Sequence, residues 1–325
     1  MSDTAVRTAR RGRGGGPGRN RDRSAARAHA TRAAWVRRRD RRGFVFVVPF
    51  LGAFVLFVLV PLGYAIYSSV YTTRIIGGTV FAGADNYRQV LGSGQFWSGV
   101  VRVVVFGTIQ ISIMLAVAFF FATIFDLGLV RFGRTWRAIF FMPFAVPIVV
   151  AALMWGFMLQ PQYGPVTRLA GAVGFQGTNF LSDRLMLPSI IVIVIWEWTG
   201  YNMVILYTAL KSVPRDIVEA ALIEGAPIRK IILRVKLPMV RPAIVMLVFL
   251  NAIGASQLFV EPLILNNYQS GVITNYYTPT YFIFNTAIGG SQYNMAAAMA
   301  VILGVVVVLI SIAALLFRRW KGELA

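Results

Sequence analysis

Long uncharged apolar runs recur along the chain, separated by shorter polar segments. An α-helix needs about 20 residues to cross the roughly 30 Å of hydrocarbon in a bilayer. Runs close to that length occupy residues 44–67, 103–125, 138–159, 187–210, 242–260 and 295–317. Several are rich in Val and Ile, but backbone groups inside lipid must be hydrogen-bonded within their own segment, so we expect helices and not strands. The pattern predicts an all-α membrane protein with about six transmembrane helices.

Basic residues between the runs predict the orientation of the chain, because Lys and Arg are retained on the cytoplasmic side. One set of segments is basic: residues 126–137 carry Arg131, Arg134 and Arg137, residues 211–241 carry Lys211, Arg215, Arg229, Lys230, Arg234, Lys236 and Arg241, and the C-terminus carries Arg318, Arg319 and Lys321. The alternate loops carry fewer basic residues, namely Arg74, Arg88 and Arg102, then Arg168 and Arg184, and no basic residue occurs from position 262 to position 294. This alternation predicts that both termini are cytoplasmic.

Composition and charge add two points. Hydrophobic residues fill 57% of the 325 positions and the mean hydropathy is +0.68, more than a water-soluble core can bury, so we expect a multi-pass protein of the inner or plasma membrane. The formal charge of +20 would suggest nucleic acid, but 14 of the 32 basic residues lie in the first 43 positions. Residues 1–43 are therefore predicted to be a basic, disordered cytoplasmic tail that lies near anionic membrane lipid, with no nucleic-acid partner.

The sequence also excludes several kinds of chemistry. Cysteine is absent and the single histidine, His29, lies in the basic tail, so disulfides, thiolate metal sites and histidine-based catalysis lack their residues. The phosphate-binding pattern G-x-x-x-x-G-K-[ST] does not occur. We therefore expect no enzyme activity, no metal and no cofactor in this chain.

The basic segment 211–241 reads as two short helices joined at a tight corner. Pro214 and Asp216 favour a helix start, and Gly225 followed by Ala226 and Pro227 favours a helix stop. The second helix would carry an apolar stripe of residues spaced three and four apart, namely Ile228, Ile231, Ile232 and Val235. A loop with this much regular structure is expected to dock onto another protein.

Residues of this loop carry a family resemblance. Glu219-Ala220-Ala221, then Gly225 after three residues, then Val235-Lys236-Leu237-Pro238 after nine more match the EAA pattern E-A-A-x3-G-x9-I-x-L-P, with Val235 in place of Ile. The chain thus resembles the permeases of binding-protein-dependent ABC importers. The wider stretch 196–242 is similar to the carbohydrate-uptake branch of those permeases, which includes the maltose permeases.

The resemblance implies an importer-type permease fold over residues 44–320, with 211–241 as a cytoplasmic coupling loop. In such permeases the coupling loop enters a groove on the ATPase, which assigns ATPase coupling to Glu219, Ala220, Ala221, Gly225, Leu237 and Pro238. The implied partners are a second permease subunit in a hetero-dimer, two ATPase subunits that bind ATP and Mg, and an extracytoplasmic solute-binding protein. The implied function is inward movement of a sugar or related polar solute, coupled to ATP hydrolysis by a separate subunit. An ABC permease for a non-sugar solute, or an ion-coupled secondary carrier, remains the alternative.

Polar residues inside the apolar runs are candidates for the solute path, because ionisable groups in a membrane are costly and face inward. The fourth run contains Glu197, Trp198, Tyr201 and Asn202, a mixture of aromatic faces with carboxylate and amide groups that suits a sugar. The end of the fifth run contributes Asn251, Gln257 and Glu261. Two other roles stay open, since aromatic residues also form interfacial belts and a buried Glu can bridge neighbouring helices. The uncharged segment 266–288 would face the solute-binding protein.

Overall fold

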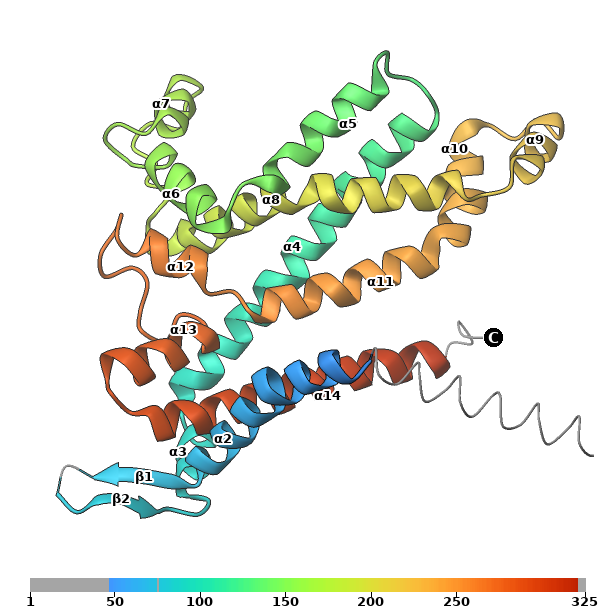
Figure 1. The fold of residues 1–325 in the computed structure, drawn as a ribbon. Helices are drawn as coiled ribbons and strands as arrows, with labels where there is room; N and C mark the ends of the chain where they lie inside the picture. The colour runs from blue at the N-terminus through green and yellow to red at the C-terminus, as the bar shows by residue number, and fades with distance from the viewer. Residues whose placement is uncertain (1–46, 75, 321–325) are drawn as a thin grey trace, which may run out of the picture. The chain divides into compact units, whose positions relative to one another are not determined.

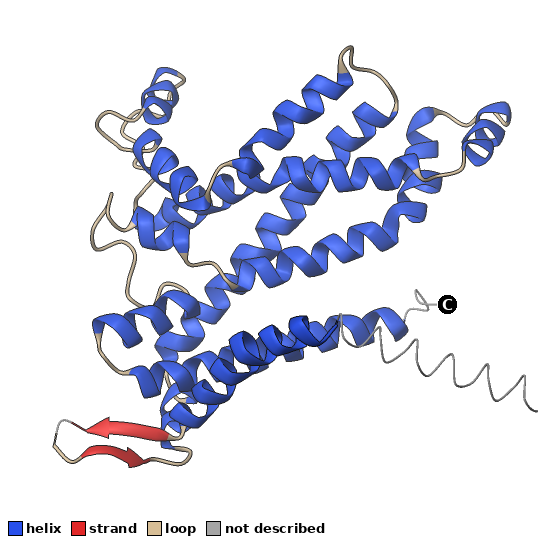
Figure 2. Ribbon diagram, in the orientation of Figure 1, coloured by secondary structure: helices blue, strands red, loops and turns tan. Residues whose placement is uncertain are grey.

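The computed structural model describes residues 47–74 and 76–320 (Figure 1). The predicted basic tail at 1–43 and Lys321 lie outside the described residues. The helices are Val47–Ser69, which includes η1 (Val55–Leu59) and α2 (Val60–Ser69), then α3 (Asp85–Leu91), α4 (Gly94–Asp126), α5 (Gly133–Phe141), η2 (Met142–Ala145), α6 (Ile148–Met158), α7 (Pro165–Ala172), α8 (Asp183–Lys211), α9 (Arg215–Ile223), α10 (Ile228–Ile231), η3 (Ile232–Lys236), α11 (Leu237–Ser256), α12 (Val260–Leu265), α13 (Pro279–Phe284), η4 (Asn285–Gly289) and α14 (Tyr293–Trp320). One antiparallel hairpin pairs β1 (Tyr71–Arg74) with β2 (Gly78–Phe81), and the rest of the described regular structure is helical (Figure 2).

Within the described part of the chain, four helices are long and apolar enough to cross a membrane: Val47–Ser69, Gly94–Asp126, Asp183–Lys211 and Ile228–Ser256. A fifth crossing results if the helices Gly133–Ala145 and Ile148–Met158 are counted together, although they meet at 94°. That bend falls inside the predicted run 138–159, and its cause is local. The helix breaks at Val146, whose backbone is extended at φ −76° and ψ 127°, because Pro147 disfavours helical geometry in the residue before it.

The interior is built where α4 packs along α8 and both contact α11. Met114 of α4, Met203 and Leu206 of α8, and Leu247 of α11 are completely buried in one apolar cluster. Small residues on α4, Ala118 among them, let the helix axes approach closely, as is usual where helices associate in lipid. The cluster joins three elements that are far apart in the sequence.

Gly200 of α8 marks the closest backbone approach in this interior. A Cβ atom at this position would overlap the backbone carbonyl of Phe140, which lies near the end of α5. Gly156 of α6 plays a similar part, because a Cβ there would lie 2.5 Å from the ring of Tyr268. Neither glycine lies in a left-handed backbone conformation. The need for glycine at both sites therefore comes from these close contacts and not from the backbone conformation.

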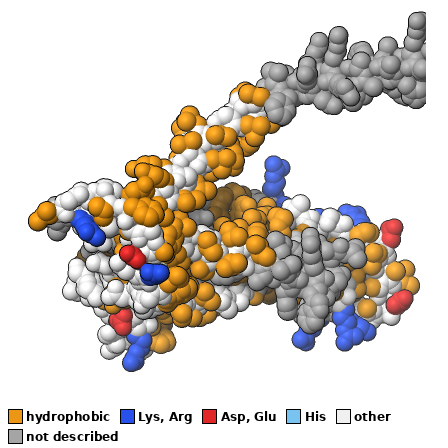
Figure 3. Space-filling view, turned by 90° about the horizontal axis from the view of Figure 1, so that it is seen from below, with side chains coloured by type: hydrophobic (Ala, Val, Ile, Leu, Met, Phe, Trp, Pro, Cys, Tyr) orange, Lys and Arg blue, Asp and Glu red, His pale blue; other side chains and the backbone are white. Residues whose placement is uncertain are grey.

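Large apolar side chains remain exposed along the outer faces of the long helices. Examples are Phe120 at 60% and Val192 at 52% exposed, on α4 and α8. Figure 3 shows apolar side chains over the middle of one face, with charged side chains mostly toward its ends. Apolar surface of this extent is unusual for a water-soluble monomer and fits contact with lipid.

Candidate functional site

The loop between α8 and α11 folds as two helical pieces around a corner. α9 begins after Pro214, and the chain turns at Gly225, whose φ of 72° lies in the left-handed region. The next helical turn begins after Pro227, and η3 then runs on into α11. The predicted first helix and corner are present, but the second helix is not a short separate one, since it is the beginning of the continuous helix Ile228–Ser256. Gly225 is needed for its backbone conformation alone, since a Cβ there would meet nothing within 4 Å.

The exposed face of α9 combines small, acidic and apolar side chains. Glu219 and Ala220 are exposed and Ala221 is half-buried. Beside them, Leu222 is 50% and Ile223 is 88% exposed. Apolar side chains that stay in water on a folded chain point to a docking surface, and small residues next to them let a partner backbone come close. Leu237 and Pro238 lie where η3 passes into α11, inside the continuous helix Ile228–Ser256, where Pro238 brings no amide hydrogen to the helix.

A cavity of about 420 Å³ opens between α4, α6, α8, α11 and α12. Five of the residues that the sequence proposes for the solute path line it: Trp198, Tyr201, Asn251, Gln257 and Glu261. The aromatic wall continues behind the lining, since the ring of Phe144 stacks on Tyr201 at 4.7 Å and meets Trp198 edge-on at 5.1 Å. The cavity lining therefore combines aromatic side chains with amide and carboxyl groups.

Asn202 lies behind the cavity and not in its lining. It is completely buried, and its Oδ1 accepts a 2.9 Å hydrogen bond from Nδ2 of Asn251. Its own Nδ2 donates to the carbonyl of Trp198 at 2.9 Å. Within α4, Nε2 of Gln110 donates a hydrogen bond to Sδ of Met114 at 3.1 Å. Asn202 thus links α8 to α11 and orients Asn251, a lining residue.

Glu197 is also buried, at 4% exposure, and does not line the cavity. Among the residues that the structure describes, its Oε2 finds no hydrogen-bond partner. Glu261 is equally buried but reaches the cavity wall. The structure therefore separates the two acidic candidates, with Glu261 at the cavity and Glu197 behind it.

The model of one family, the binding-protein-dependent transport system inner membrane component, matches residues 109–321. The chain belongs to this family. It is therefore an inner-membrane permease subunit of an ABC importer, as the EAA pattern predicts, and not itself an enzyme, because ATP is hydrolysed by a separate subunit in this family. The matched segment contains the coupling loop and most of the cavity-lining residues.

The relatives of this permease are transport-system permeases, and the similarity extends over most of the length of each. The chain is 27% identical to the sn-glycerol-3-phosphate transport system permease protein UgpA of Pectobacterium atrosepticum, over 82% of this chain and 90% of that protein. It is 28% identical to the lactose transport system permease protein LacF of Rhizobium radiobacter, over 79% and 87%. It is also 28% identical to the trehalose/maltose transport system permease protein MalF of Thermococcus litoralis, over 68% and 76%.

The permease fold is shared with a solved structure. A bacterial ABC transporter involved in the import of the acidic polysaccharide alginate contains a chain with a TM-score of 0.76 and 20% identity, covering 89% of this chain and 98% of that one. A bacterial alginate ABC transporter in complex with an alginate pentasaccharide-bound periplasmic protein contains a chain with a TM-score of 0.75, also at 20% identity, covering 87% of this chain and 96% of that one. The helical importer-permease architecture is thus confirmed.

The cavity lining also includes residues that the sequence did not single out: Phe106, Gln110, Ile148, Val194, Leu250, Gly254, Ala255, Leu258 and Val260. Gln110 could have been found, because it is the only amide side chain in the apolar run 103–125 and amides inside spans face the protein interior. Phe106 and Ile148 carry no such signal. An apolar side chain in a span looks the same whether it faces lipid or a cavity.

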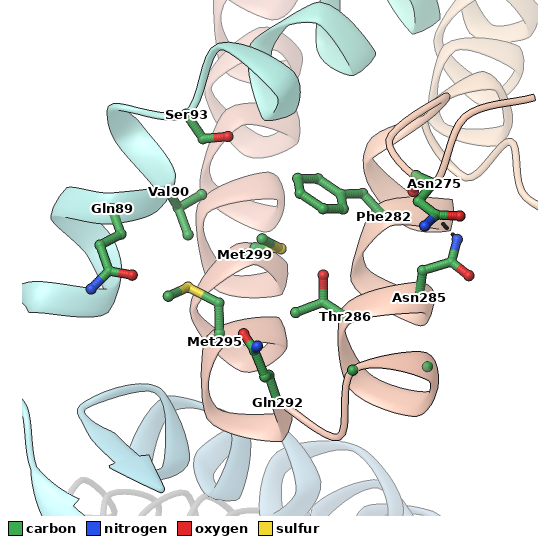
Figure 4. A pocket seen from close by; sticks show the side chains of 12 residues that line it. Gln89, Val90, Ser93, Asn275, Phe282, Asn285, Thr286, Gln292, Met295 and Met299 are labelled. Atoms are coloured by element: carbon green, nitrogen blue, oxygen red, sulfur yellow. Dashed lines mark hydrogen bonds between the residues drawn. The ribbon is translucent and has the colours of Figure 1, made fainter. Parts of the chain in front are cut away.

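A second pocket of about 580 Å³ lies among α3, α13, η4 and the start of α14 (Figure 4). Its side chains are uncharged: Gln89, Asn275, Asn285 and Gln292 provide amides, Ser93 and Thr286 hydroxyls, and Val90, Phe282, Met295 and Met299 apolar surface. Asn285 donates from Nδ2 to the carbonyl of Asn275 at 3.3 Å and so closes one side. This pocket belongs in part to the segment 266–288 that the sequence places on the outer side.

The segment next to this pocket is tied to α4 by Tyr277 and Arg102. The Arg102 guanidinium donates to the Tyr277 carbonyl at 2.8 Å and lies 4.4 Å from the centre of its ring. Burial raises the pKa of the Tyr277 phenol to about 12, and the positive charge of Arg102 opposes that rise. Tyr277 therefore stays neutral at physiological pH and acts as a fixed structural group.

Proposed function

We propose that this permease forms one half of a pathway that moves a sugar or related polar solute inward, with ATP hydrolysed by separate subunits. The observation that carries the proposal is the cavity, whose lining combines the aromatic side chains of Trp198 and Tyr201 with the polar groups of Asn251, Gln257 and Glu261. Sugars have apolar C–H faces that stack on rings and hydroxyls that need hydrogen-bond partners. The cavity supplies both.

The charge of the cavity favours an uncharged solute. Glu261 is its one ionisable lining residue apart from Tyr201, and no Lys or Arg is among the described lining residues. A phosphate or carboxylate group would meet a carboxyl group there without a compensating cation, which costs affinity in a desolvated site. Among the solutes named for relatives and structural neighbours, lactose or trehalose and maltose therefore suit this lining better than glycerol-3-phosphate or alginate.

The proposed complex contains a second permease, two ATPase subunits that bind ATP and Mg, and an extracytoplasmic solute-binding protein. The exposed apolar and small residues of α9 support an ATPase contact at the coupling loop. A solute-binding partner is supported by the structural neighbour that was solved with a periplasmic protein. In this arrangement Glu219, Ala220, Ala221 and Gly225 dock, while Leu237 and Pro238 couple the loop to the helix Ile228–Ser256, which carries the motion inward.

Six spans with both termini cytoplasmic remain the proposed topology, with α14 as the last span. A reporter fused after Arg134 or Arg229 should read cytoplasmic, because these positions lie in the basic loops. A reporter fused near Arg168 or Asn275 should read external. An external signal at Arg229 would remove the coupling loop from the side where ATP is hydrolysed and contradict the proposal.

Uptake by the assembled complex in vesicles tests the function itself. Radiolabelled lactose, maltose and glycerol-3-phosphate are offered with the solute-binding protein outside and ATP inside. We expect one of the neutral sugars to accumulate only when both ATP and the binding protein are present. Accumulation driven by an ion gradient without the ATPase would support the secondary carrier instead, and uptake of glycerol-3-phosphate alone would contradict the neutral-sugar assignment.

Asn251→Leu should lower the apparent affinity for the transported sugar about tenfold, because one solute hydrogen bond is lost and Oδ1 of Asn202 is left without its donor. The matched control is Val192→Leu on the exposed outer face of α8, which should transport normally. The measurement is the KM for uptake, corrected for the amount of inserted protein. An unchanged KM in Asn251→Leu would place the solute path elsewhere.

A further inference from the structure

Asp126 is the last residue of α4, and its carboxylate is almost fully buried, with the side chain 4% exposed. This is an unfavourable place for a negative charge, since the C-terminal end of a helix is itself partially negative and burial removes water. Two lysines compensate. Nζ of Lys236 pairs with Oδ2, and Nζ of Lys211 lies 3.1 Å from Oδ1 and also donates to the Asp126 carbonyl at 3.1 Å.

The two lysines come from opposite ends of the coupling loop. Lys211 is the last residue of α8, where the loop begins, and Lys236 is the last residue of η3, where the loop joins α11. α9, the corner at Gly225 and α10 all lie between them. Figure 1 shows the ends of α4 and α8 and the start of α11 at the same end of the molecule as α9 and α10. One carboxylate therefore closes the base of the whole loop.

We propose that Asp126 is a positioning residue for energy coupling, which holds the two ends of the coupling loop together on the end of α4 by binding Lys211 and Lys236. The proposal rests on the coupling role proposed for this loop. With the base closed, a displacement of α9 moves the ends of α4, α8 and α11 together, and these three helices line the solute cavity. Without it, the same displacement bends the loop and leaves the helices in place.

An ion triad suits this task better than apolar packing. Dispersion contacts lose much of their strength when a gap of less than about 1 Å opens, whereas the attraction between charges falls only with the inverse of distance. The loop can therefore pivot while its base stays closed. The two lysines are expected to interact with Asp126 with different strength. The Lys236 side chain is 10% exposed and that of Lys211 is 48% exposed, so water screens the charge of Lys211 more.

Asp126→Asn tests the proposal in the complete complex with its ATPase and solute-binding protein, because asparagine keeps the shape and removes the charge. We expect normal insertion and normal basal ATP hydrolysis, with uptake and binding-protein-stimulated hydrolysis both reduced about tenfold. Lys236→Met should give a similar loss, and Lys211→Met a loss of about threefold or less. Lys230→Met, at an exposed lysine of α10, is the matched control and should behave as wild type.

A double variant, Asp126→Asn with Lys236→Met, separates positioning from two independent effects, since partners in one interaction do not lose activity additively. We expect the double variant to be no worse than Asp126→Asn. Multiplied losses, wild-type uptake in Asp126→Asn, or a lowered abundance with normal uptake per molecule would each overturn the proposal. Glu219→Lys is measured alongside. If Glu219→Lys abolishes stimulated ATP hydrolysis while Asp126→Asn does not, the role proposed for Asp126 is wrong and the coupling role of the loop is supported. If neither variant affects stimulated hydrolysis, both proposals are wrong.

Discussion

Glu219→Lys and Gly225→Val should each abolish solute uptake while leaving the permease folded and inserted. Glu219 is exposed on α9, so reversing its charge disturbs no contact inside the chain. The reversal places a positive charge where the partner would bind a carboxylate. Gly225 is exposed as well, and at a φ of 72° a β-branched residue is strongly disfavoured. The measurement is uptake together with retention of the ATPase and stimulated ATP hydrolysis.

The structure provides matched controls for both variants. Gly225→Asn should retain much of the activity, because asparagine tolerates the left-handed conformation and a side chain at this position meets no other atom. Arg229→Ala changes an exposed charge of α10 and should cost little, since such pairs contribute about 0–1 kcal/mol. Wild-type uptake in Glu219→Lys and Gly225→Val would contradict the coupling role of the loop.

Gly200→Val should prevent the permease from folding into a stable, inserted protein. The added side chain would overlap the backbone carbonyl of Phe140, and a backbone group cannot rotate away as a side chain can. Overpacking a core already costs about 1–3 kcal/mol where side chains can adjust, and here α8 must separate from α5. We expect little folded protein by size-exclusion chromatography in detergent and a lowered midpoint of thermal unfolding in any that remains.

Gly304→Ala is the control for Gly200→Val, because it adds a Cβ to a long helix at a position where nothing lies within 4 Å. This change should leave folding intact or stabilise it by about 0.5–1 kcal/mol through the higher helix propensity of alanine. Normal yield and stability in Gly200→Val would show that α8 and α5 can move apart, and would contradict the close approach described here.

Features that depend on local spacing could be predicted from the sequence. Helices in a membrane follow from apolar runs, because only hydrogen bonds within the segment satisfy the backbone in lipid. The EAA pattern and the glycine corner of the loop 211–241 are also local, and in the structure α9 ends at Ile223 and the chain turns at Gly225, as the spacing predicts. Trp198 and Tyr201 lie one turn apart on α8, so their shared face could be predicted as well.

Which apolar and polar side chains meet across helices depends on tertiary packing and could not be predicted from local spacing. Gln110 joins the cavity from α4, whereas Asn202 and Glu197, which looked equivalent to Tyr201 in the sequence, turn away from it. A helix in lipid shows little contrast between its lipid face and its protein face, because both are apolar, so periodicity does not fix its rotation. The meeting of Asp126 with Lys211 and Lys236, which are 85 and 110 positions away in the chain, depends on the packing of α4 between α8 and α11. Burial there makes the pairing obligatory, since a charge removed from water needs a partner nearby.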